Sequence, residues 1–381
     1  MKVLFVTHYA DLYGANLSLL GLMISLKKNY SIEPIVLINR KGEFIKELER
    51  NNIKYIRTFY FIDQIEENQP HKRCHVLYRK LFMPFLYFYA FFKIRKEKII
   101  FDLIHTNSSV VSIGEYLARK FSVPHIWHLR EFGREDYSLE NMYSVNTIKK
   151  RLSNSKIIAI SDSIKEKFVS EYGELSIEVI ANGISICERY TKDEPNGLIS
   201  FVVIGLICEG KNQLEVLKAI KIIVSKEIKN FCVYFYGDFK DEEYKFKFLN
   251  FVKDNELDKF VHIMGYVENV KEQLKSDCIG IVPSKKEAFG RVTIEFMSNY
   301  MPVIGSNSGG NKEIIIDKKT GLLYDLGAEC CLAQKMIYYL ENRNEIIRMG
   351  KNARIEAEKY SVDENAKKIK EVYDLVLEKG R

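Results

Sequence analysis

Residues 282–297 read VPSKKEAFGRVTIEFM, and this stretch decides the fold class. It predicts a strand that ends in a proline, a loop that carries Glu287, and a helix that begins at Gly290 and contains Glu295. The apolar segment 302–305 follows closely and predicts a second strand. A strand, a loop, a helix and another strand in this order are typical of a parallel α/β sheet, in which ligands bind at the carboxyl ends of the strands.

The same alternation of short β-branched runs and longer helical patterns extends over most of the chain. It pauses once, at the polar stretch ERYTKDEPNG (188–197), which we interpret as a linker. We therefore expect domains at 1–188 and 189–360, followed by a helix at 361–381 that could pack on either domain, including a return to the first. The predicted strands lie at 2–7, 33–38, 53–56, 102–106, 124–129, 156–160, 177–181, 199–204, 231–236, 261–264, 278–282 and 302–305.

The net charge of +7 is confined to one segment of this 381-residue chain. Residues 71–98 hold eight Lys or Arg residues and one acid, whereas the rest of the chain carries 50 basic and 50 acidic side chains. A general nucleic-acid-binding function is therefore disfavoured, and no nucleic-acid partner is expected. The composition, 46 % apolar and 29 % charged, is that of a globular protein. Seven cysteines without a C-x-x-C pair predict free thiols in a reducing cytoplasm.

The helix start near Gly290 predicts an anion site. Backbone N–H groups at 290–292 have no partner within a helix, and the helix dipole favours negative charge at this end. Glu287 and Glu295 flank the same place. Because ionised carboxylates only accept hydrogen bonds, they suit hydroxyl-rich groups such as a sugar or a ribose.

Two further strand-to-helix turns could bind phosphate. Residues 205–212 read GLICEGKN and nearly match the phosphate-loop pattern, but Asn212 lacks the hydroxyl that would hold magnesium, so we disfavour a phosphate-loop NTPase. Lys211 is still well placed to meet a phosphate, and a solvated surface lysine is the alternative. Gly14, after the first strand, either lets backbone N–H groups approach an anion or simply begins a helix.

The chain resembles the retaining glycosyltransferases of family four, which have the GT-B fold of two facing Rossmann-like domains with parallel sheets and a cleft between them. The resemblance covers nearly the whole chain, and its specific element is the E-x7-E motif from Glu287 to Glu295. Weaker matches are the turn at Gly14, Trp127-His128, and the segments 159–163, 179–183, 211–213 and 264–267.

The resemblance implies roles in donor binding for the loop and helix start at 287–292. Glu287 corresponds to the first Glu of the motif, which meets the hydroxyl groups of the donor sugar. The backbone of Phe289 and Gly290 lies beside that sugar, and the N–H groups of Arg291 and Val292 bind the diphosphate.

The resemblance implies further contacts to the rest of the donor. Glu295 binds the ribose, Lys211 neutralises the leaving diphosphate, and the backbone of Tyr266 and Val267 flanks the base. One residue departs from the family pattern, because Leu206 stands where an arginine often helps the lysine. Loss of a cation beside a leaving group should slow transfer unless another cation replaces it.

In the first domain, the resemblance places His128 near the reacting sugar and Gly14 where the acceptor-side domain closes on the donor. A histidine in an apolar strand can equally be a satisfied core residue. Arg130 and Glu131 follow at the end of the same strand, either facing the cleft or bonded within the domain. Arg130 and Arg291 are candidates to replace the cation missing at Leu206.

These observations predict an enzyme that moves a sugar from a nucleotide-diphosphate sugar to a hydroxyl acceptor, and the resemblance implies retention of anomeric configuration. The resemblance suggests a lipid-linked glycan acceptor in cell-surface or capsular polysaccharide synthesis. No D-x-D motif occurs, so we expect no metal and no cofactor. The alternatives are a non-catalytic sugar-nucleotide or glycan-binding protein, and a GT-B epimerase or hydrolase. A nicotinamide dehydrogenase is disfavoured because G-x-G-x-x-G is absent from the sequence.

The segment 71–98 combines its eight basic residues with eight aromatic ones. Its apolar run at 81–92 is too short to span a bilayer, which takes about 20 residues. It suits an interfacial element on an anionic membrane leaflet, and a helix buried against the sheet is the alternative. We therefore expect a cytoplasmic protein that is peripheral on the inner face of the cell membrane.

Overall fold

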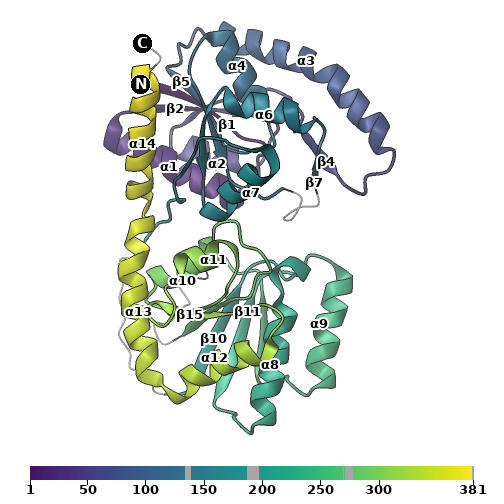
Figure 1. Cartoon of the computed structure of the whole chain (residues 1–381), viewed down its shortest axis with the longest axis vertical. Helices are drawn as coiled ribbons and strands as arrows, with labels where there is room; N and C mark the ends of the chain where they lie inside the picture. Colours follow the sequence, from purple (N-terminus) through teal and green to yellow (C-terminus); the bar gives the residue numbers. More distant parts are fainter. Residues whose placement is uncertain (134–138, 187–196, 269, 271–277, 380–381) are drawn as a thin grey trace. The chain divides into compact units, whose positions relative to one another are not determined.

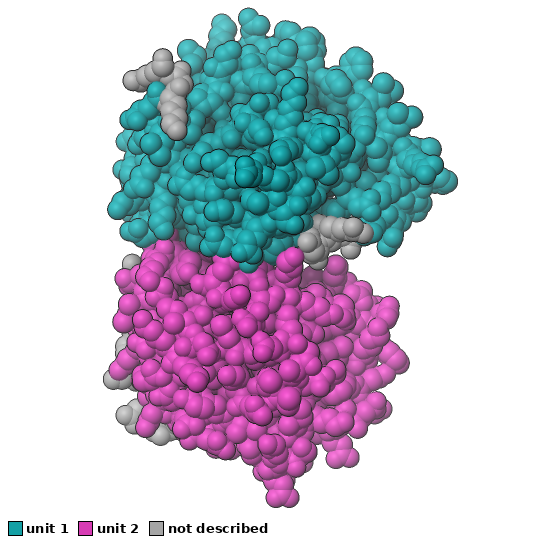
Figure 2. Space-filling model, viewed as in Figure 1, with its two compact units in different colours: residues 1–183, 362–381 teal, residues 184–361 magenta. Residues whose placement is uncertain are grey.

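The computed structural model describes residues 1–133, 139–186, 197–268, 270 and 278–379. The chain divides into two compact units, residues 1–183 with 362–381 and residues 184–361 (Figure 2). The predicted linker at 188–197 lies outside the described residues except for its last position. The two Rossmann-like α/β domains expected from the alternating pattern are present, and we describe each by itself.

The described part of the first unit contains a seven-stranded parallel sheet in the order β3-β2-β1-β5-β6-β8-β9 (Figure 1). A separate two-stranded antiparallel pair joins β4 to β7. The elements are β1 (Lys2–Val6), α1 (Gly14–Tyr30), β2 (Glu33–Ile38), α2 (Glu43–Arg50), β3 (Lys54–Arg57), β4 (Gln64–Glu66), α3 (Lys72–Lys96), β5 (Leu103–Thr106), α4 (Ile113–Phe121), β6 (His125–Leu129), β7 (Leu139–Asn141), α6 (Val145–Ser153), β8 (Lys156–Ala159), α7 (Asp162–Tyr172), β9 (Ile177–Val179) and α14 (Val362–Lys379).

The first sheet is buried on both faces, as its uninterrupted apolar strands predict. Successive side chains of β1 point to opposite faces, so Val3 and Phe5 belong to one core cluster and Leu4 and Val6 to another. The first cluster is completed by α1 and α14, and the second by α3 and α4.

The carboxyl-terminal helix α14 packs on α1 of the first unit. Asp363 accepts hydrogen bonds from Ser25 Oγ at 2.6 Å and from Asn29 Nδ2 at 2.9 Å. The buried side chains of α14 include Ile369 and Tyr373, which lie in the core behind β1. The chain therefore starts and ends in the same unit.

In the second unit the described strands form a six-stranded parallel sheet in the order β12-β11-β10-β13-β14-β15. The elements are β10 (Ile199–Ile204), the 3-10 turn η1 (Glu209–Lys211), α8 (Gln213–Ser225), β11 (Phe231–Tyr236), α9 (Glu242–Asp254), β12 (Val261–Gly265), β13 (Ile279–Val282), α10 (Arg291–Ser298), β14 (Val303–Ser306), α11 (Gly309–Ile314), β15 (Gly321–Tyr324), α12 (Glu329–Glu341), α13 (Arg343–Ala357) and the 3-10 turn η3 (Glu358–Tyr360).

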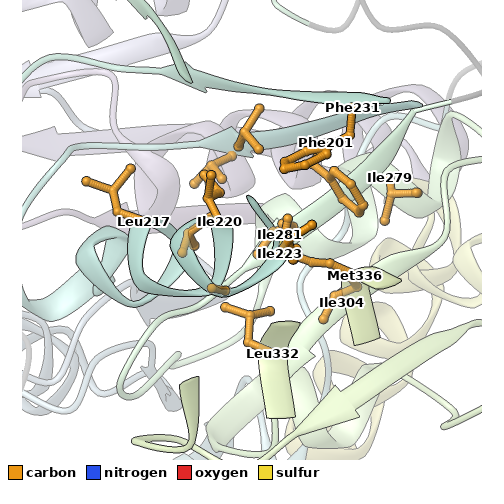
Figure 3. Close-up of a cluster of buried hydrophobic side chains, with 14 of the residues drawn as sticks. Phe201, Leu217, Ile220, Ile223, Phe231, Ile279, Ile281, Ile304, Leu332 and Met336 are labelled. Atoms are coloured by element: carbon orange, nitrogen blue, oxygen red, sulfur yellow. The ribbon is translucent and has the colours of Figure 1, made fainter. Parts of the chain in front are cut away.

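The core of the second unit lies between the sheet and helices α8 and α12. Figure 3 shows Ile279 and Ile281 of β13 with Ile220 of α8 and Met336 of α12 among the clustered side chains. The cysteines in the described part of the chain form no disulfide, as their spacing predicts.

Each sheet reverses its strand order once, between β1 and β5 and between β10 and β13. In an open parallel sheet, such a switch point leaves a crevice at the carboxyl ends of the two strands, where ligands bind. The predicted strands are all present with ends shifted by at most two residues, and β2, β10 and β11 have the predicted ends, whereas β4, β7 and β15 were not predicted.

Candidate functional site

The helix α10 begins where the sequence predicts, and its start is shaped by a glycine. Gly290 precedes the helix with φ at 94°, a conformation that side chains rarely adopt. A Cβ atom at this position would lie 2.8 Å from Cδ1 of Ile314. The N–H of Gly290 was predicted to be free, but it donates a hydrogen bond to the side chain of Glu287. Arg291 and Val292 are the first two residues of α10, a position at which backbone N–H groups have no acceptor within the helix.

The glycine pair after β14 lets the chain approach the loop that carries Glu287. The N–H of Gly310 donates to the carbonyl oxygen of Glu287 at 2.7 Å. A Cβ on Gly309 would lie 2.3 Å from that oxygen, and one on Gly310 would lie 2.0 Å from the carbonyl oxygen of Phe289. Real side chains do not tolerate such distances, so both positions require glycine for the loop to keep its place.

Glu287 and Lys211 are brought together at the switch point between β10 and β13. Lys211 Nζ lies 2.7 Å from Glu287 Oε2, although the two residues are 76 positions apart. The loops that carry them are also joined through the backbone, since the N–H of Lys285 donates to the carbonyl oxygen of Gly210 at 3.0 Å. Residues predicted to contact the sugar and the diphosphate are therefore neighbours.

The electrostatics of this pair favour the charged state of the Glu287 carboxyl. Burial is the largest single influence and raises the pKa of Glu287, but the charge of Lys211 and the hydrogen bonds from Lys211, Ser284 and the N–H of Gly290 together outweigh it. The pKa of Glu287 is therefore held below its usual range. The carboxylate is ionised at neutral pH and can only accept hydrogen bonds.

A buried carboxylate that sequence reasoning missed supports the lysine loop. Glu215 of α8 accepts hydrogen bonds from Tyr324 Oη at 3.1 Å and from the N–H of Gly327 at 2.8 Å. It also accepts from the side chain of Asn212, which has φ at 58° directly after Lys211. A glutamate within the apolar face of a predicted helix was the signal that could have revealed it.

The second glutamate of the motif lies on the first turns of α10. Glu295 Oε1 is 3.0 Å from Nε of Arg291, one turn earlier on the same helix, and both side chains are mostly buried. Arg291 is therefore already paired within its helix, which weakens it as a replacement for the cation missing at the exposed Leu206. Phe289 is buried beside Tyr360.

The residues predicted to flank the base follow β12. Tyr266 is 73 % exposed, and its N–H donates to Asp238 Oδ1 at 3.1 Å. The preceding turn is held by the N–H of Gly237, which donates to the carbonyl oxygen of Gly265 at 2.8 Å. Val267 is half-buried. The backbone N–H of Tyr266 is thus engaged within its own unit.

In the first unit, His128 of β6 is fully buried in a hydrogen-bonded chain. His128 Nδ1 lies 3.0 Å from Nε2 of His105 and 3.3 Å from Nη2 of Arg130, and His105 Nδ1 lies 2.7 Å from the hydroxyl of Tyr373. Arg130 also donates to the side chain of Asn182. The sequence analysis missed His105 and Tyr373, because contacts between segments far apart in the chain leave no recognisable pattern in the sequence.

The charged pair after β6 is bonded within its own unit, one of the two arrangements left open. Glu131 accepts hydrogen bonds from Ser108 Oγ at 2.5 Å and from the N–H of Ser109 at 2.7 Å. Burial raises its pKa, and the bonds from both serines oppose that rise. Arg130 donates hydrogen bonds to His128 and Asn182. Like Arg291, it therefore already has partners, which weakens it as a replacement for the cation missing at Leu206.

The first strand-to-helix turn holds one more histidine. His8 follows β1, and its Nδ1 is buried without a hydrogen-bond partner among the described residues. Burial, then the charges of Arg40 and Arg130, lower its pKa to about 3. Gly14 begins α1, and a Cβ there would meet nothing within 4 Å, so packing does not require a glycine. The turn is fixed instead by Asn16, which donates to the carbonyl oxygen of Asp11 at 2.8 Å.

The basic and aromatic segment forms helix α3, which has two apolar faces. One face is buried in the core of its unit through Met83, Tyr87, Ala90 and Ile94. The opposite face remains exposed. Its large apolar side chains, each between 41 and 70 % exposed, are Leu77, Tyr78, Leu81, Phe82, Phe85, Phe88, Tyr89 and Phe92.

Some basic side chains of α3 are bonded within their own unit, and others are exposed near its ends. Arg79 and Lys93 donate to backbone carbonyl oxygens of their own unit, at 2.9 and 2.7 Å. Arg73, Arg95 and Lys96 are exposed near the two ends of the helix. Among the described residues, no helix has the length and apolar character needed to cross a bilayer. The described residues also contain no group of three or more His, Cys, Asp or Glu side chains arranged to hold a metal ion.

Part of the chain matches a family model, and several curated glycosyltransferases are similar to the chain. Residues 188–356 match the family model of the glycosyl transferases group 1. The chain is 25 % identical over 323 residues to the capsular polysaccharide biosynthesis glycosyltransferase CapH of Staphylococcus aureus, covering 82 % of this chain and 83 % of that protein. It is also 25 % identical over 311 residues to the UDP-Gal:alpha-D-GlcNAc-diphosphoundecaprenol alpha-1,3-galactosyltransferase of Escherichia coli, covering 75 % and 78 %.

A solved structure supports the fold. The crystal structure of HepE of Anabaena in complex with UDP superposes with a TM-score of 0.80, covering 98 % of this chain and 100 % of that one, at 19 % identity. The fold is therefore the GT-B fold, with a parallel α/β sheet in each of two Rossmann-like domains.

Proposed function

We propose that this chain, a glycosyltransferase whose residues 188–356 belong to the glycosyl transferases group 1, moves a sugar with retention from a nucleotide-diphosphate donor to a hydroxyl acceptor. The observation that carries the proposal is the Lys211–Glu287 pair at the switch point of the second sheet, 2.7 Å apart and next to the start of α10. HepE of Anabaena, which has the same fold, is a UDP complex, and this supports a nucleotide as the ligand.

In this proposal Glu287 and Lys211 exchange partners when the donor binds. The Glu287 carboxylate accepts hydrogen bonds from sugar hydroxyls beside Phe289 and Gly290, and the freed Lys211 ammonium meets the diphosphate. The N–H groups of Arg291 and Val292 add backbone donors, and the helix dipole adds positive potential. All of these groups are fixed before the reaction, so they stabilise the charge that develops on the leaving phosphate.

We assign the remaining contacts to the ribose, the base and the side of the donor that faces the first unit. Glu295 accepts from the ribose hydroxyls, the backbone at Tyr266 and Val267 flanks the base, and Gly14 lies where the first unit meets the donor. During transfer the bond from the sugar carbon to the phosphate oxygen breaks, and a bond to the acceptor oxygen forms on the same face. The leaving phosphate oxygen takes the acceptor proton. We propose that neither a metal nor a cofactor takes part, because Lys211 and the helix N–H groups supply the positive charge.

The test compares two lysine–glutamate pairs of the same domain. Lys211→Met should lower kcat by about 100-fold or more, since loss of one group that stabilises a developing charge costs roughly that much. Lys218 pairs with Glu329 at 2.6 Å on the surface, so Lys218→Met is the matched control and should change neither rate nor melting temperature appreciably. Equal rates for Lys211→Met and the wild type, at saturating donor, would overturn the assigned role.

For the acceptor, we propose a lipid-linked glycan of a cell-surface or capsular polysaccharide. The Escherichia coli relative is named for a diphosphoundecaprenol-linked acceptor, and the Staphylococcus aureus relative for capsular polysaccharide biosynthesis. Helix α3 supports a membrane location, because its exposed apolar face is flanked by the basic residues Arg73, Arg95 and Lys96. The protein would thus be peripheral on the inner, cytoplasmic face of the cell membrane.

The energetics of α3 favour an anionic bilayer as the occupant of its exposed face. Partly buried aromatic and leucine side chains gain free energy when they enter the headgroup region, and each basic residue near an anionic surface adds about 1 kcal/mol. A helix that is apolar on all sides is ordinarily covered. The basic residues at both ends of α3 favour an anionic lipid surface over an apolar protein surface, because only the former attracts them.

Liposome sedimentation tests this location. The wild-type protein should sediment with phosphatidylglycerol vesicles at low salt and much less with phosphatidylcholine vesicles. Phe85→Ser with Phe88→Ser should release it, whereas Phe246→Ser, which alters an equally exposed phenylalanine of the second unit, should not. Failure of the wild-type protein to bind anionic vesicles, or unchanged binding of the double variant, would contradict the proposal.

A further inference from the structure

The buried chain of hydrogen bonds around His128 determines where its proton lies. An arginine side chain only donates hydrogen bonds, so the contact from Arg130 Nη2, at 3.3 Å, requires an acceptor lone pair on His128 Nδ1. The neutral imidazole must then carry its proton on Nε2. Burial, the charge of Arg130 and the neighbouring His105 all lower the pKa of His128 well below its ordinary value, which keeps the ring neutral.

The tautomer of His105 follows from that of His128. Because His128 Nδ1 is an acceptor, His105 Nε2, 3.0 Å away, must be the donor. His105 is neutral as well, since burial and then Arg130 lower its pKa well below the ordinary value. Its Nδ1 therefore holds a lone pair, which accepts the hydroxyl proton of Tyr373 at 2.7 Å. The order of donation runs from Tyr373 through His105 to His128.

One atom of this chain is left without a partner. His128 Nε2 is buried, and no described residue offers it a hydrogen bond. A buried donor without an acceptor is unfavourable, so its retention points to a ligand oxygen as the missing partner. The side chain of His128 is itself fully buried, on the strand next to β5 in the first sheet.

We propose that Tyr373 and His105 are positioning residues that hold His128 in the tautomer with its proton on Nε2, so that His128 donates a hydrogen bond to a substrate oxygen and does not act as a general base. The inference rests on the proposed function for the identity of the substrate. It gives the carboxyl-terminal helix α14 a part in the reaction, because Tyr373 belongs to that helix. Tyr373 would act only through the two histidines.

Nitrogen NMR of the full chain with 15N-labelled histidine tests the tautomer without any substrate. We expect a pyridine-type shift for His128 Nδ1 and a pyrrole-type shift for His128 Nε2. The contact from Arg130 is long, at 3.3 Å, and does not fix the tautomer of His128 by itself, so Tyr373→Phe, which removes the hydroxyl that fixes His105, should mix the two tautomers. A protonated Nδ1 on His128 in the wild-type protein, or an unchanged spectrum in Tyr373→Phe, would overturn the inference even if glycosyl transfer is confirmed.

Kinetics test whether Tyr373 acts through His128. Tyr373→Phe should lower kcat about two- to tenfold, the effect of one buried hydrogen bond, with little change in KM for the donor. In a His128→Gln background, where the amide needs no tautomer, the same change should cost nothing further. Tyr339→Phe is the control, since it removes a buried tyrosine hydroxyl of the other unit that donates to the sulfur of Met349. Equal effects of Tyr373→Phe in both backgrounds, or an equal loss in Tyr339→Phe, would show a merely structural role.

If no nucleotide sugar is turned over, the proposed function fails, and the NMR result still decides the tautomer. The single tryptophan, Trp127, lies beside His128 on β6, so its fluorescence shows whether each variant is folded around this site.

Discussion

At the residue scale, the charges of the candidate site are paired with one another. Lys211 with Glu287, and Arg291 with Glu295, form ion pairs of 2.7 and 3.0 Å. In each pair the basic side chain can bind a phosphate group, and the glutamate can accept hydrogen bonds from hydroxyl groups. A donor that offers both phosphate and hydroxyl groups can therefore replace both partners at once, so no charge is left buried and alone.

The sequence predicted these residues but not their pairing. The spacing from Glu287 to Glu295 is local and can be read directly, whereas Lys211 is far away along the chain and meets Glu287 only because β10 and β13 are adjacent strands. Leu206 remains a departure from the family pattern. Neither Arg130 nor Arg291 is available without breaking an existing bond, so the structure does not supply the replacement expected from them.

A prediction at this scale concerns Gly310. Gly310→Ala would place a Cβ atom 2.0 Å from the carbonyl oxygen of Phe289 and would push the Glu287 loop away from α11. We expect the free energy of unfolding to fall by about 1–3 kcal/mol, as for other strained backbone positions. Donor affinity should fall with it, since Gly310 also donates to Glu287.

Calorimetry of donor binding and thermal unfolding measure both effects. Lys312→Ala, an exposed position two residues further along α11, serves as the control and should change neither. Wild-type affinity and stability in Gly310→Ala would show that the close approach of the two loops is not needed.

At the element scale, long and strongly patterned segments were predictable and short ones were not. The apolar runs of β1 or β10 stand out from their surroundings, but β4 and β7 have only three residues each and contain polar side chains. Their pairing depends on a partner 77 residues away. The burial of α3 was left open by the sequence because its apolar residues surround the helix, and only tertiary packing selects which face is covered.

Buried histidines in and next to the central strands of the first sheet should make the stability of the first unit depend on pH. Burial lowers the pKa of His8 and His125 to about 3, and those of His105 and His128 also lie well below 6.5. The unfolded chain binds protons near pH 6.5, whereas the folded one does not. The contribution of these histidines to the free energy of unfolding is therefore fully present above about pH 6.5. Below that pH it falls by about 1.4 kcal/mol per histidine for each pH unit.

Asp63 opposes this trend, because burial raises its pKa to about 6 and folding is favoured by its protonation. Glu131, whose pKa burial also raises, acts in the same direction, but four histidines outweigh these two carboxyls, so net stability should decrease with acid. Urea unfolding followed by Trp127 fluorescence at about pH 7 and about pH 5.5 measures the difference. Equal stability at the two pH values would contradict the account of neutral, buried imidazoles, and with it the protonation states assigned around His128.

At the scale of the whole molecule, the chain comprises two α/β units, and the sheet of each unit has one switch point of the kind at which ligands bind. The alternating pattern sufficed to predict this organisation, because βαβ units repeat in sequence as they do in space. The final helix was different. Its apolar spacing fitted either unit, and its place is decided by contacts such as that of Asp363 with Ser25, 338 positions apart.

The central claim is retaining transfer from a nucleotide-diphosphate sugar, and analysis of the product tests it most directly. The purified chain, kept in EDTA, is incubated with a panel of nucleotide-diphosphate sugars and a polyprenyl-diphosphate-linked N-acetylglucosamine acceptor, and the product is examined by mass spectrometry and proton NMR. We predict a lengthened glycan whose new linkage keeps the anomeric configuration of the donor sugar. An inverted linkage, free or isomerised sugar without a lengthened glycan, or activity that returns only with added manganese would contradict the account.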